Sequence, residues 1–151
     1  MVIAAESDAP VGAWRHSHTL VHPRGPSEPM LGHVHNEATL RLAVQWPTPG
    51  VVAVRIGGEV DLASLPRLTE MIRQRLRAAS LDAVVLDFSE VTYASSAALE
   101  LLMTARRRCK QRGIELVVVP GGRPVGHLLE LAGLTELFTL RPDLPAALNH
   151  T

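Results

Sequence analysis

The stretch Ala83-Val84-Val85-Leu86-Asp87-Phe88-Ser89-Glu90-Val91-Thr92-Tyr93-Ala94-Ser95-Ser96-Ala97-Ala98-Leu99 decides the fold. Its first four residues form a continuous apolar run between Asp82 and Asp87, which predicts a short strand buried on both faces, as parallel sheets require. Its last residues begin a helix predicted over about 96–112. The polar segment in between therefore joins a buried strand to a helix start.

Helices and strands continue to alternate after this stretch. The helix over 96–112 is expected to end at Gly113. Its side chains expected to face inward are Leu99, Leu102, Met103 and Cys109. The elements expected beyond it are a strand over 114–119, a helix over about 124–132 ended by Gly133, a strand near 138–140 and a short helix from Pro142.

A hairpin and a further helix are predicted before the deciding stretch. Apolar and polar residues alternate over 40–46, which is typical of a strand with one buried face. The break Pro47-Thr48-Pro49-Gly50 and the apolar run over 51–56 then indicate a hairpin. A helix follows with Ser64 as its N-cap and Pro66 in its first turn. Its apolar stripe consists of Leu65, Leu68, Ile72 and Leu76.

The predicted element order is β-β-α-β-α-β-α-β-α. Strands that alternate with helical crossovers indicate an α/β fold with a mixed sheet of about five strands and about four helices. Residues 1–37 hold four prolines and five histidines without an apolar period, so we expect a disordered N-terminal tail followed by one domain over 38–151. The tail histidines are expected to be solvated rather than to bind a metal.

Composition limits the classes of function. Fifteen basic residues balance fifteen acidic ones, so no overall charge would hold the chain on nucleic acid or on an anionic membrane. The single cysteine, Cys109, excludes an intrachain disulfide and is expected to be buried and unreactive. No signal peptide or membrane-spanning apolar run is present, which favours a cytoplasmic protein.

The junction between the buried strand and the helix at about residue 96 is the candidate site. A helix start directs free backbone N–H groups outward, and the positive end of the helix dipole favours an anion there. A phosphate on a serine at this place would add about −1.5 to −2 charges and change the surface without unfolding the domain.

Two segments resemble the STAS domain of bacterial anti-sigma-factor antagonists. The junction is similar to the family's phosphorylation motif, commonly Asp-Ser-Ser-Gly-Leu after a Val-Thr-Phe-like strand end. The segment Gly58-Glu59-Val60-Asp61-Leu62-Ala63-Ser64 is similar to the family's Gly-Glu-Leu-Asp-Leu-Ala-Thr. Both segments occur in the family's order and spacing, and the resemblance covers about residues 40–148.

The resemblance places the phosphoacceptor on Ser96, with Ser95 as the less favoured candidate. Ser95 fills the family's aspartate position, and Ala97 and Ala98 replace its serine and glycine. Loss of the glycine removes backbone freedom, and the two alanines are expected to place β-carbons beside the surface that contacts the partner. The partner-binding residues implied by the resemblance are Asp61, Ser64, Ser95, Ser96 and Ala97.

The mechanism implied by the resemblance is partner switching rather than catalysis by this chain. The unphosphorylated antagonist would bind an anti-sigma factor with serine kinase activity and free a sigma factor, and phosphorylation would release it. ATP would be bound by the partner, and no cofactor or metal is expected on this chain. Direct contact with nucleic acid or membrane is not expected either, and an edge strand near Leu40 leaves room for a weak homodimer.

Three alternatives stay open. In the first, the chain is a non-phosphorylated or ligand-sensing STAS module that acts as a signalling scaffold. The departures from the family motif at Ala97 and Ala98 favour this alternative. In the second, Ser96 is only the N-cap of its helix and is not phosphorylated. In the third, Asp61 is an acidic residue at a helix start that contacts no partner. A serine hydrolase is disfavoured, because the Gly-x-Ser-x-Gly elbow is absent and His127 has no identifiable orienting acid.

Overall fold

A computed structural model describes residues 40–77 and 80–151 of the chain. The predicted disordered tail lies outside the described residues. The elements, in chain order, are β1 (Arg41–Thr48), β2 (Val51–Val60), α3 (Leu65–Leu76), β3 (Ala83–Ala94), α4 (Ala97–Arg112), β4 (Glu115–Val119), α5 (Arg123–Ala132), the 3-10 helix η2 (Thr135–Leu137), β5 (Thr139–Leu140) and α6 (Leu144–His150). Apart from η2, this is the predicted order.

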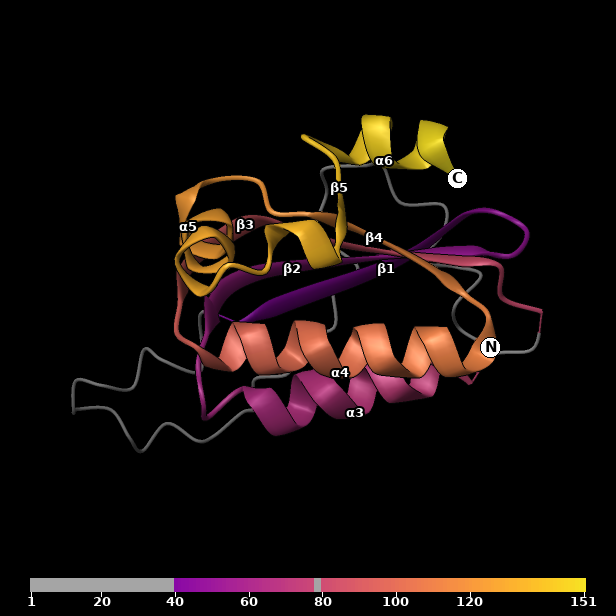
Figure 1. Cartoon of the computed structure of the whole chain (residues 1–151). Helices are drawn as coiled ribbons and strands as arrows, with labels where there is room; N and C mark the ends of the chain where they lie inside the picture. Colours follow the sequence, from indigo (N-terminus) through magenta and orange to yellow (C-terminus); the bar gives the residue numbers. More distant parts are fainter. Residues whose placement is uncertain (1–39, 78–79) are drawn as a thin grey trace.

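The described strands form one mixed sheet in the order β1-β2-β3-β4-β5 (Figure 1). The first pair is the predicted antiparallel hairpin, which turns at Pro49-Gly50, and Gly50 has the positive φ of 84° that favours glycine. Every other pair is parallel. The prediction of an α/β fold with a mixed five-stranded sheet is therefore confirmed.

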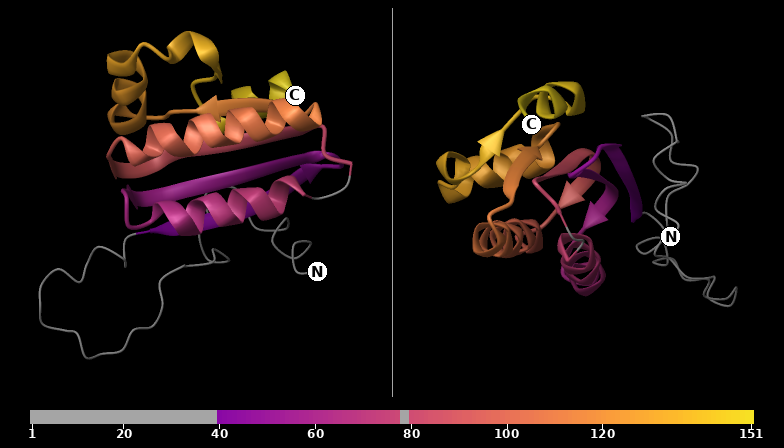
Figure 2. Two further views of the ribbon diagram at one scale, coloured as in Figure 1. Left: turned by 60° about the horizontal axis from the view of Figure 1, so that its bottom comes forward. Right: turned by 90° about the vertical axis from the view of Figure 1, so that its right-hand side faces the viewer.

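Helices cover both faces of the sheet unequally. Figures 1 and 2 show α3 and α4 side by side below the sheet and α6 above it, with α5 at one end. The large core lies between the sheet and α3, α4 and α5, and Phe88 is its largest fully buried side chain. A small second cluster under α6 consists of Ala53, Val85, Val117, Val119, Leu144 and Ala147. No helix in the described part of the chain is long and apolar enough to cross a membrane.

The central strand β3 is much longer than predicted. Asp87 was expected to end the strand near Leu86, but β3 continues to Ala94 and pairs with the second half of β2. Asp87 is accommodated inside the sheet because it is buried beside Arg55, with Nε and Oδ2 3.6 Å apart, and because its Oδ1 accepts a hydrogen bond from the Ser89 N–H. A charged residue within a strand was read as the end of that strand.

Smaller differences concern faces and ends. The middle of strand β1 is buried on both faces rather than on one, because Ala43 and Gln45 are buried as well. Helix α6 begins at Leu144 rather than Pro142, because the Asp143 carboxylate accepts a hydrogen bond from the Ala146 N–H at 2.9 Å and caps the helix. The predicted left-handed ends at Gly113 and Gly133 are confirmed, with φ of 68° and 71°.

Candidate functional site

The candidate site lies at the edge where the parallel strands end and α3, α4 and α5 begin, which we call the carboxyl edge. Strands β2 and β3 end opposite each other, with Val60 beside Ala94. The Ser95 N–H then donates to the Val60 carbonyl oxygen at 2.9 Å. The start of α3 and the start of α4 are therefore held next to each other, at the left end of Figure 1.

A closed turn leads into α3. The Asp61 carboxylate accepts a hydrogen bond from the Ser64 N–H at 3.0 Å, and the Ser64 hydroxyl accepts one from the Asp61 N–H at 3.0 Å and donates to the Asp61 carbonyl at 3.1 Å. Ser64 occupies the predicted N-cap position, but its hydroxyl caps no helical amide. It is buried, whereas Asp61 is half-exposed. Ser64 therefore holds the turn together, and its contact with a partner stays a prediction.

The two serines at the start of α4 have different environments. The Ser95 hydroxyl accepts a hydrogen bond from the Ala97 N–H at 3.1 Å, so Ser95 supports the first turn of the helix. Ser96 is the N-cap by position, but its side chain makes no capping bond and is exposed. The expectation that the Ser96 hydroxyl caps the helix is therefore wrong, and Ser96 presents the more accessible hydroxyl of the pair.

The backbone amides at this helix start are already occupied. The Ala97 N–H is bound by the Ser95 side chain, and the Ala98 N–H donates to the Ser95 carbonyl at 2.9 Å. The expectation of free amides that could hold a phosphate is therefore wrong for these two positions. An anion here would be favoured by the helix dipole and by solvent.

Ala97 and Ala98 face the core instead of the surface. Their exposed fractions are 3% and 0%, because α4 packs its first turn against the sheet. Their β-carbons are therefore buried rather than exposed as expected, and contact of Ala97 with a partner stays a prediction. On α4, Leu101 and Ala105 also point inward, while the predicted Leu99 and Met103 are only half-buried.

Two exposed apolar side chains at the carboxyl edge were missed by sequence reasoning. Leu62, directly after Asp61, is 72% exposed, and Tyr93, directly before Ala94, is 52% exposed. Each interrupts the local pattern, since Leu62 belongs to no helical stripe and Tyr93 is a large exposed aromatic residue at the end of a strand. That mismatch was the available signal. We call Asp61, Leu62, Tyr93 and Ser96 the contact surface.

Chemistry of other kinds finds little support in the described residues. They contain no group of three side chains that could hold a metal ion. His127 is exposed on α5, and no hydrogen bond joins it to Ser95 or Ser96. The arrangement at the carboxyl edge is suited to binding and to modification of an exposed hydroxyl.

Comparison with known proteins identifies the class of this chain. The sequence model of the STAS domain matches residues 47–147, which is more than half of the chain. The chain belongs to the STAS domain family, as the resemblance of the two helix-start segments predicted.

Individual relatives share a common description. The chain is 32% identical over 100 residues to the anti-sigma-F factor antagonist RsfB of Mycobacterium tuberculosis. The aligned region covers 66% of this chain and 80% of that protein. It is 28% identical to a crystal structure of an anti-sigma factor antagonist from Mycobacterium paratuberculosis, with a TM-score of 0.64 over 74% of this chain and 93% of the other. SpoIIAA of Bacillus in its phosphorylated form shares the fold alone, at 14% identity and a TM-score of 0.57 over 73% of this chain and 99% of that one.

Proposed function

We propose that this chain is an anti-sigma-factor antagonist that binds an anti-sigma factor through the contact surface and thereby frees a sigma factor. The observation that carries the proposal is that Leu62, Tyr93 and Ser96 are all exposed at the carboxyl edge, where β2 and β3 end and α3 and α4 begin. Large apolar side chains left in solvent at a polar edge are typical of a protein-binding site. The names of the relatives above support the same reading.

Phosphorylation of Ser96 is the proposed switch. A phosphate there would add about −1.5 to −2 charges at the helix start whose first turn holds Glu100, and at the same edge of the sheet as Asp61. Because the nearby amides of Ala97 and Ala98 are already bonded, the phosphate would stay in solvent and act through charge and bulk. A partner that fits an apolar patch with a neutral hydroxyl would then be repelled.

The kinase activity and its ATP are assigned to the partner. The proposed contribution of this chain to the reaction is to present a hydroxyl on a rigid helix start. Ser95, whose oxygen is held by the Ala97 amide, is the proposed orienting residue at the place where the family carries an aspartate. The chain itself is proposed to be no enzyme, to act in the cytoplasm and to contact neither nucleic acid nor membrane.

The test is incubation of the full-length chain with the kinase-type anti-sigma factors of the same genome and Mg-ATP, with the phosphate located by mass spectrometry. We expect phosphate on Ser96, loss of labelling in Ser96→Ala, and release of the partner on labelling. Ser95→Ala removes the neighbouring hydroxyl, so phosphate should still be located on Ser96 in this variant, although the proposed orienting role of Ser95 predicts slower labelling. Phosphate on another residue would overturn the assignment of Ser96.

A second candidate is a non-phosphorylated STAS module that acts as a scaffold. It is favoured by the burial of Ala97 and Ala98, which leaves a shorter exposed motif around Ser96. In the same experiment this candidate predicts stable binding of an anti-sigma factor with no phosphate incorporated. Absence of binding to every anti-sigma factor would contradict both candidates.

A further inference from the structure

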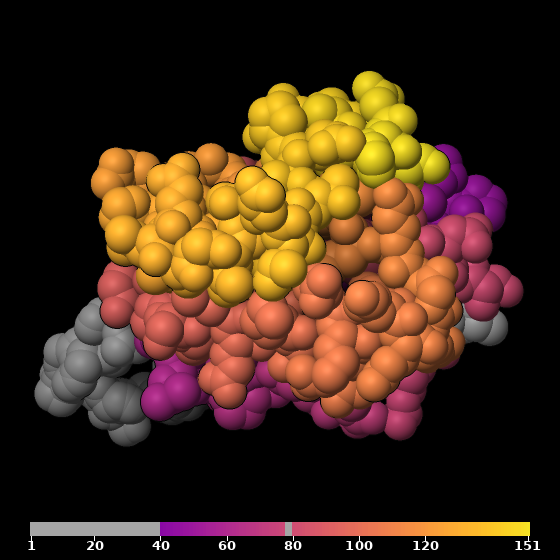
Figure 3. All heavy atoms as spheres, viewed as in Figure 1, coloured from indigo at the N-terminus to yellow at the C-terminus, as the bar shows by residue number. Residues whose placement is uncertain are grey.

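A hollow of about 240 Å³ lies far from the contact surface, between the second half of α4 and the edge formed by β4 and β5. In Figure 3 it appears as a recess between the orange C-terminal half of α4 and the yellow segment that precedes α6. Its apolar lining consists of Ile114, Leu116, Leu137 and Phe138.

The short last strand opens this hollow. Strand β5 has two residues, and it pairs with β4 only at Val117 and Val118. The first two residues of β4, Glu115 and Leu116, therefore have no strand beside them on that side among the described residues. The turn that holds Leu137 is fastened to α4 by one hydrogen bond, from Arg106 Nε to the Leu137 carbonyl oxygen at 3.2 Å.

Both charged side chains that line the hollow are cations. Arg106 and Lys110 lie one turn apart on α4 and stand at its rim. The carboxylate of the nearby Glu115 contacts His150 instead of these two cations, with its Oε2 2.6 Å from His150 Nε2. The rim is therefore positively charged, and the floor is apolar. The buried Cys109 sulfur and Thr139 complete the lining.

We propose that this hollow binds a small carboxylate with an apolar body, such as an aryl or medium-chain alkyl carboxylate. Its volume exceeds the roughly 150 Å³ of a cavity known to accept benzene, so a ring and a short acidic arm fit. The apolar body would cover Leu116 and Leu137, and the carboxylate would meet Lys110 and the outer nitrogens of Arg106. A carboxylate held by such cations forms charge-assisted hydrogen bonds. This site is independent of the proposed function.

The test is a methyl NMR titration of the full-length chain with phenylacetate and octanoate, and with 2-phenylethanol as the uncharged counterpart. We expect saturable shifts for the methyl groups of Ile114, Leu116 and Leu137 with the carboxylates, and at least about fivefold weaker binding of the alcohol.

Paired variants separate a specific site from general attraction to the basic helix end. Lys110→Gln should weaken phenylacetate at least about fivefold, whereas Arg107→Gln, an exposed neighbour that does not line the hollow, should leave the affinity unchanged. Absence of saturable shifts at millimolar carboxylate would overturn the proposal. Equal loss in the two variants, or equal binding of the alcohol, would overturn the assignment of the carboxylate.

Discussion

The two ends of α4 carry opposite charges, and the carboxyl edge exposes the large apolar side chains of Leu62 and Tyr93. At the carboxyl edge Glu100 lies in the first turn of α4, while Arg73 and Arg75 lie in the last turn of α3, and Lys110 and Arg112 in that of α4. The helix dipole favours acids at the first end and bases at the second, so both charge groups have a reason in stability. Exposure of Leu62 and Tyr93 has no such reason, and this difference supports the carboxyl edge as the proposed binding end.

The largest expected effect comes from removing that apolar pair. Leu62→Ser with Tyr93→Ser should weaken binding to the anti-sigma factor by about 100-fold, since truncated hot-spot side chains typically cost 2 kcal/mol or more. Stability should change by less than about 0.5 kcal/mol per residue, because both side chains are exposed. Calorimetric titration measures the first effect and urea unfolding the second.

The control for this pair is Leu131→Ser on α5. Leu131 is as exposed as Leu62, at 71%, but lies outside the contact surface. It should leave the affinity unchanged. Equal losses in the control and in the double variant would mean that exposure alone does not mark the binding end.

The next effect concerns Cys109, near the basic end of α4. Burial raises the pKa of its thiol to about 11, from an ordinary value of 9.0. The unfolded chain then loses this proton near pH 9 and the folded chain near pH 11, so the free energy of unfolding should fall as pH rises between these values, by about 2 kcal/mol. Cys109→Ala should lack this part of the decline in urea unfolding at pH 8 to 11. Identical curves for the two proteins would contradict the raised pKa.

At the carboxyl edge Asp61 combines a structural role with the proposed binding role. Asp61→Ala removes the carboxylate that accepts from the Ser64 N–H and should cost about 1 kcal/mol of stability, as loss of a helix cap does. Asp61→Asn can keep that hydrogen bond and should restore most of the stability. If binding to the anti-sigma factor also recovers in Asp61→Asn, the negative charge of Asp61 does not contribute to binding.

At the basic end, the hydrogen bond that joins α4 to α3 should affect stability but not binding to the partner. The Arg112 guanidinium, from the last turn of α4, donates to the Leu76 carbonyl oxygen at 2.6 Å and so caps the end of α3. Arg112→Ala should therefore destabilise the fold by about 1 kcal/mol, and Arg107→Ala by less than about 0.5 kcal/mol. Partner affinity should be the same in both, and a loss in Arg112→Ala beyond its stability effect would extend the binding surface to this end.

Most of the fold was predictable because its signals are local. The apolar runs of β3 and β4, the stripe of α3 and the glycines at 113 and 133 each identify an element within a few residues. The full length of β3 was not predictable, because the charge of the buried Asp87 is met by Arg55, which lies 32 positions earlier in the chain. Local patterns do not contain such a pairing.

The site was predictable as a place but not in its details. The resemblance identified both helix starts, and the parallel sheet brings them together. Which serine caps α4 depends on rotamers at Ser95 and Ser96, and the sequence favours neither. The burial of Ala97 depends on how α4 is rotated about its axis, which its mixed stripe of small and large residues left undetermined.

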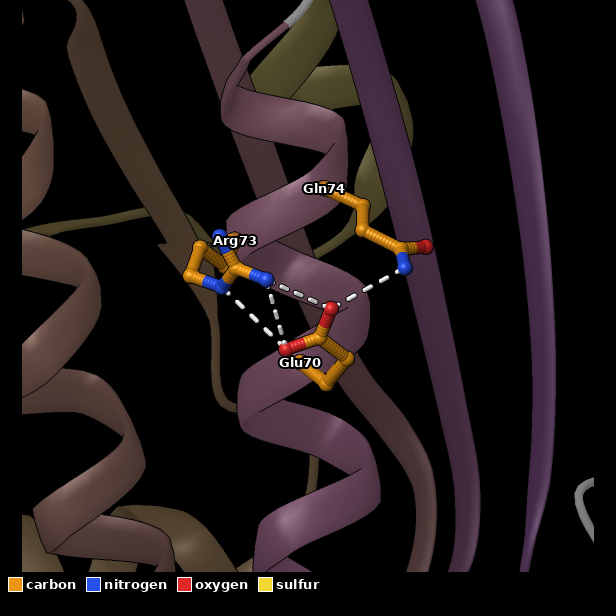
Figure 4. A network of polar contacts seen from close by, with 3 residues as sticks. All are labelled: Glu70, Arg73 and Gln74. Atoms are coloured by element: carbon orange, nitrogen blue, oxygen red, sulfur yellow. Dashed lines mark hydrogen bonds and ion pairs between the residues drawn. The ribbon is translucent and has the colours of Figure 1, made fainter.

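The smallest expected effect lies between the two ends, on the exposed face of α3. Figure 4 shows the Glu70 carboxylate bound by Arg73, with Nη2 2.7 Å from Oε2, and by the Gln74 amide at 3.0 Å. The hydrogen bonds from Arg73 lower the pKa of Glu70 below its ordinary value of 4.5. The linked stability is present above pH 4.5 and is lost as pH falls through the lowered pKa, but at this exposed position it should be too small to detect by unfolding.

Carboxyl NMR titration should therefore show a pKa of Glu70 below its ordinary value of 4.5, and Arg73→Gln should remove most of that shift. Arg77→Gln is the matched control, since Arg77 contributes only a weak Coulomb attraction to Glu70. Because Arg73 is paired with Glu70, the net positive charge on the exposed face of α3 is smaller than the number of its arginines implies. An unchanged Glu70 titration in Arg73→Gln would mean that the arginine is free, and the basic end would then extend along α3 towards the contact surface.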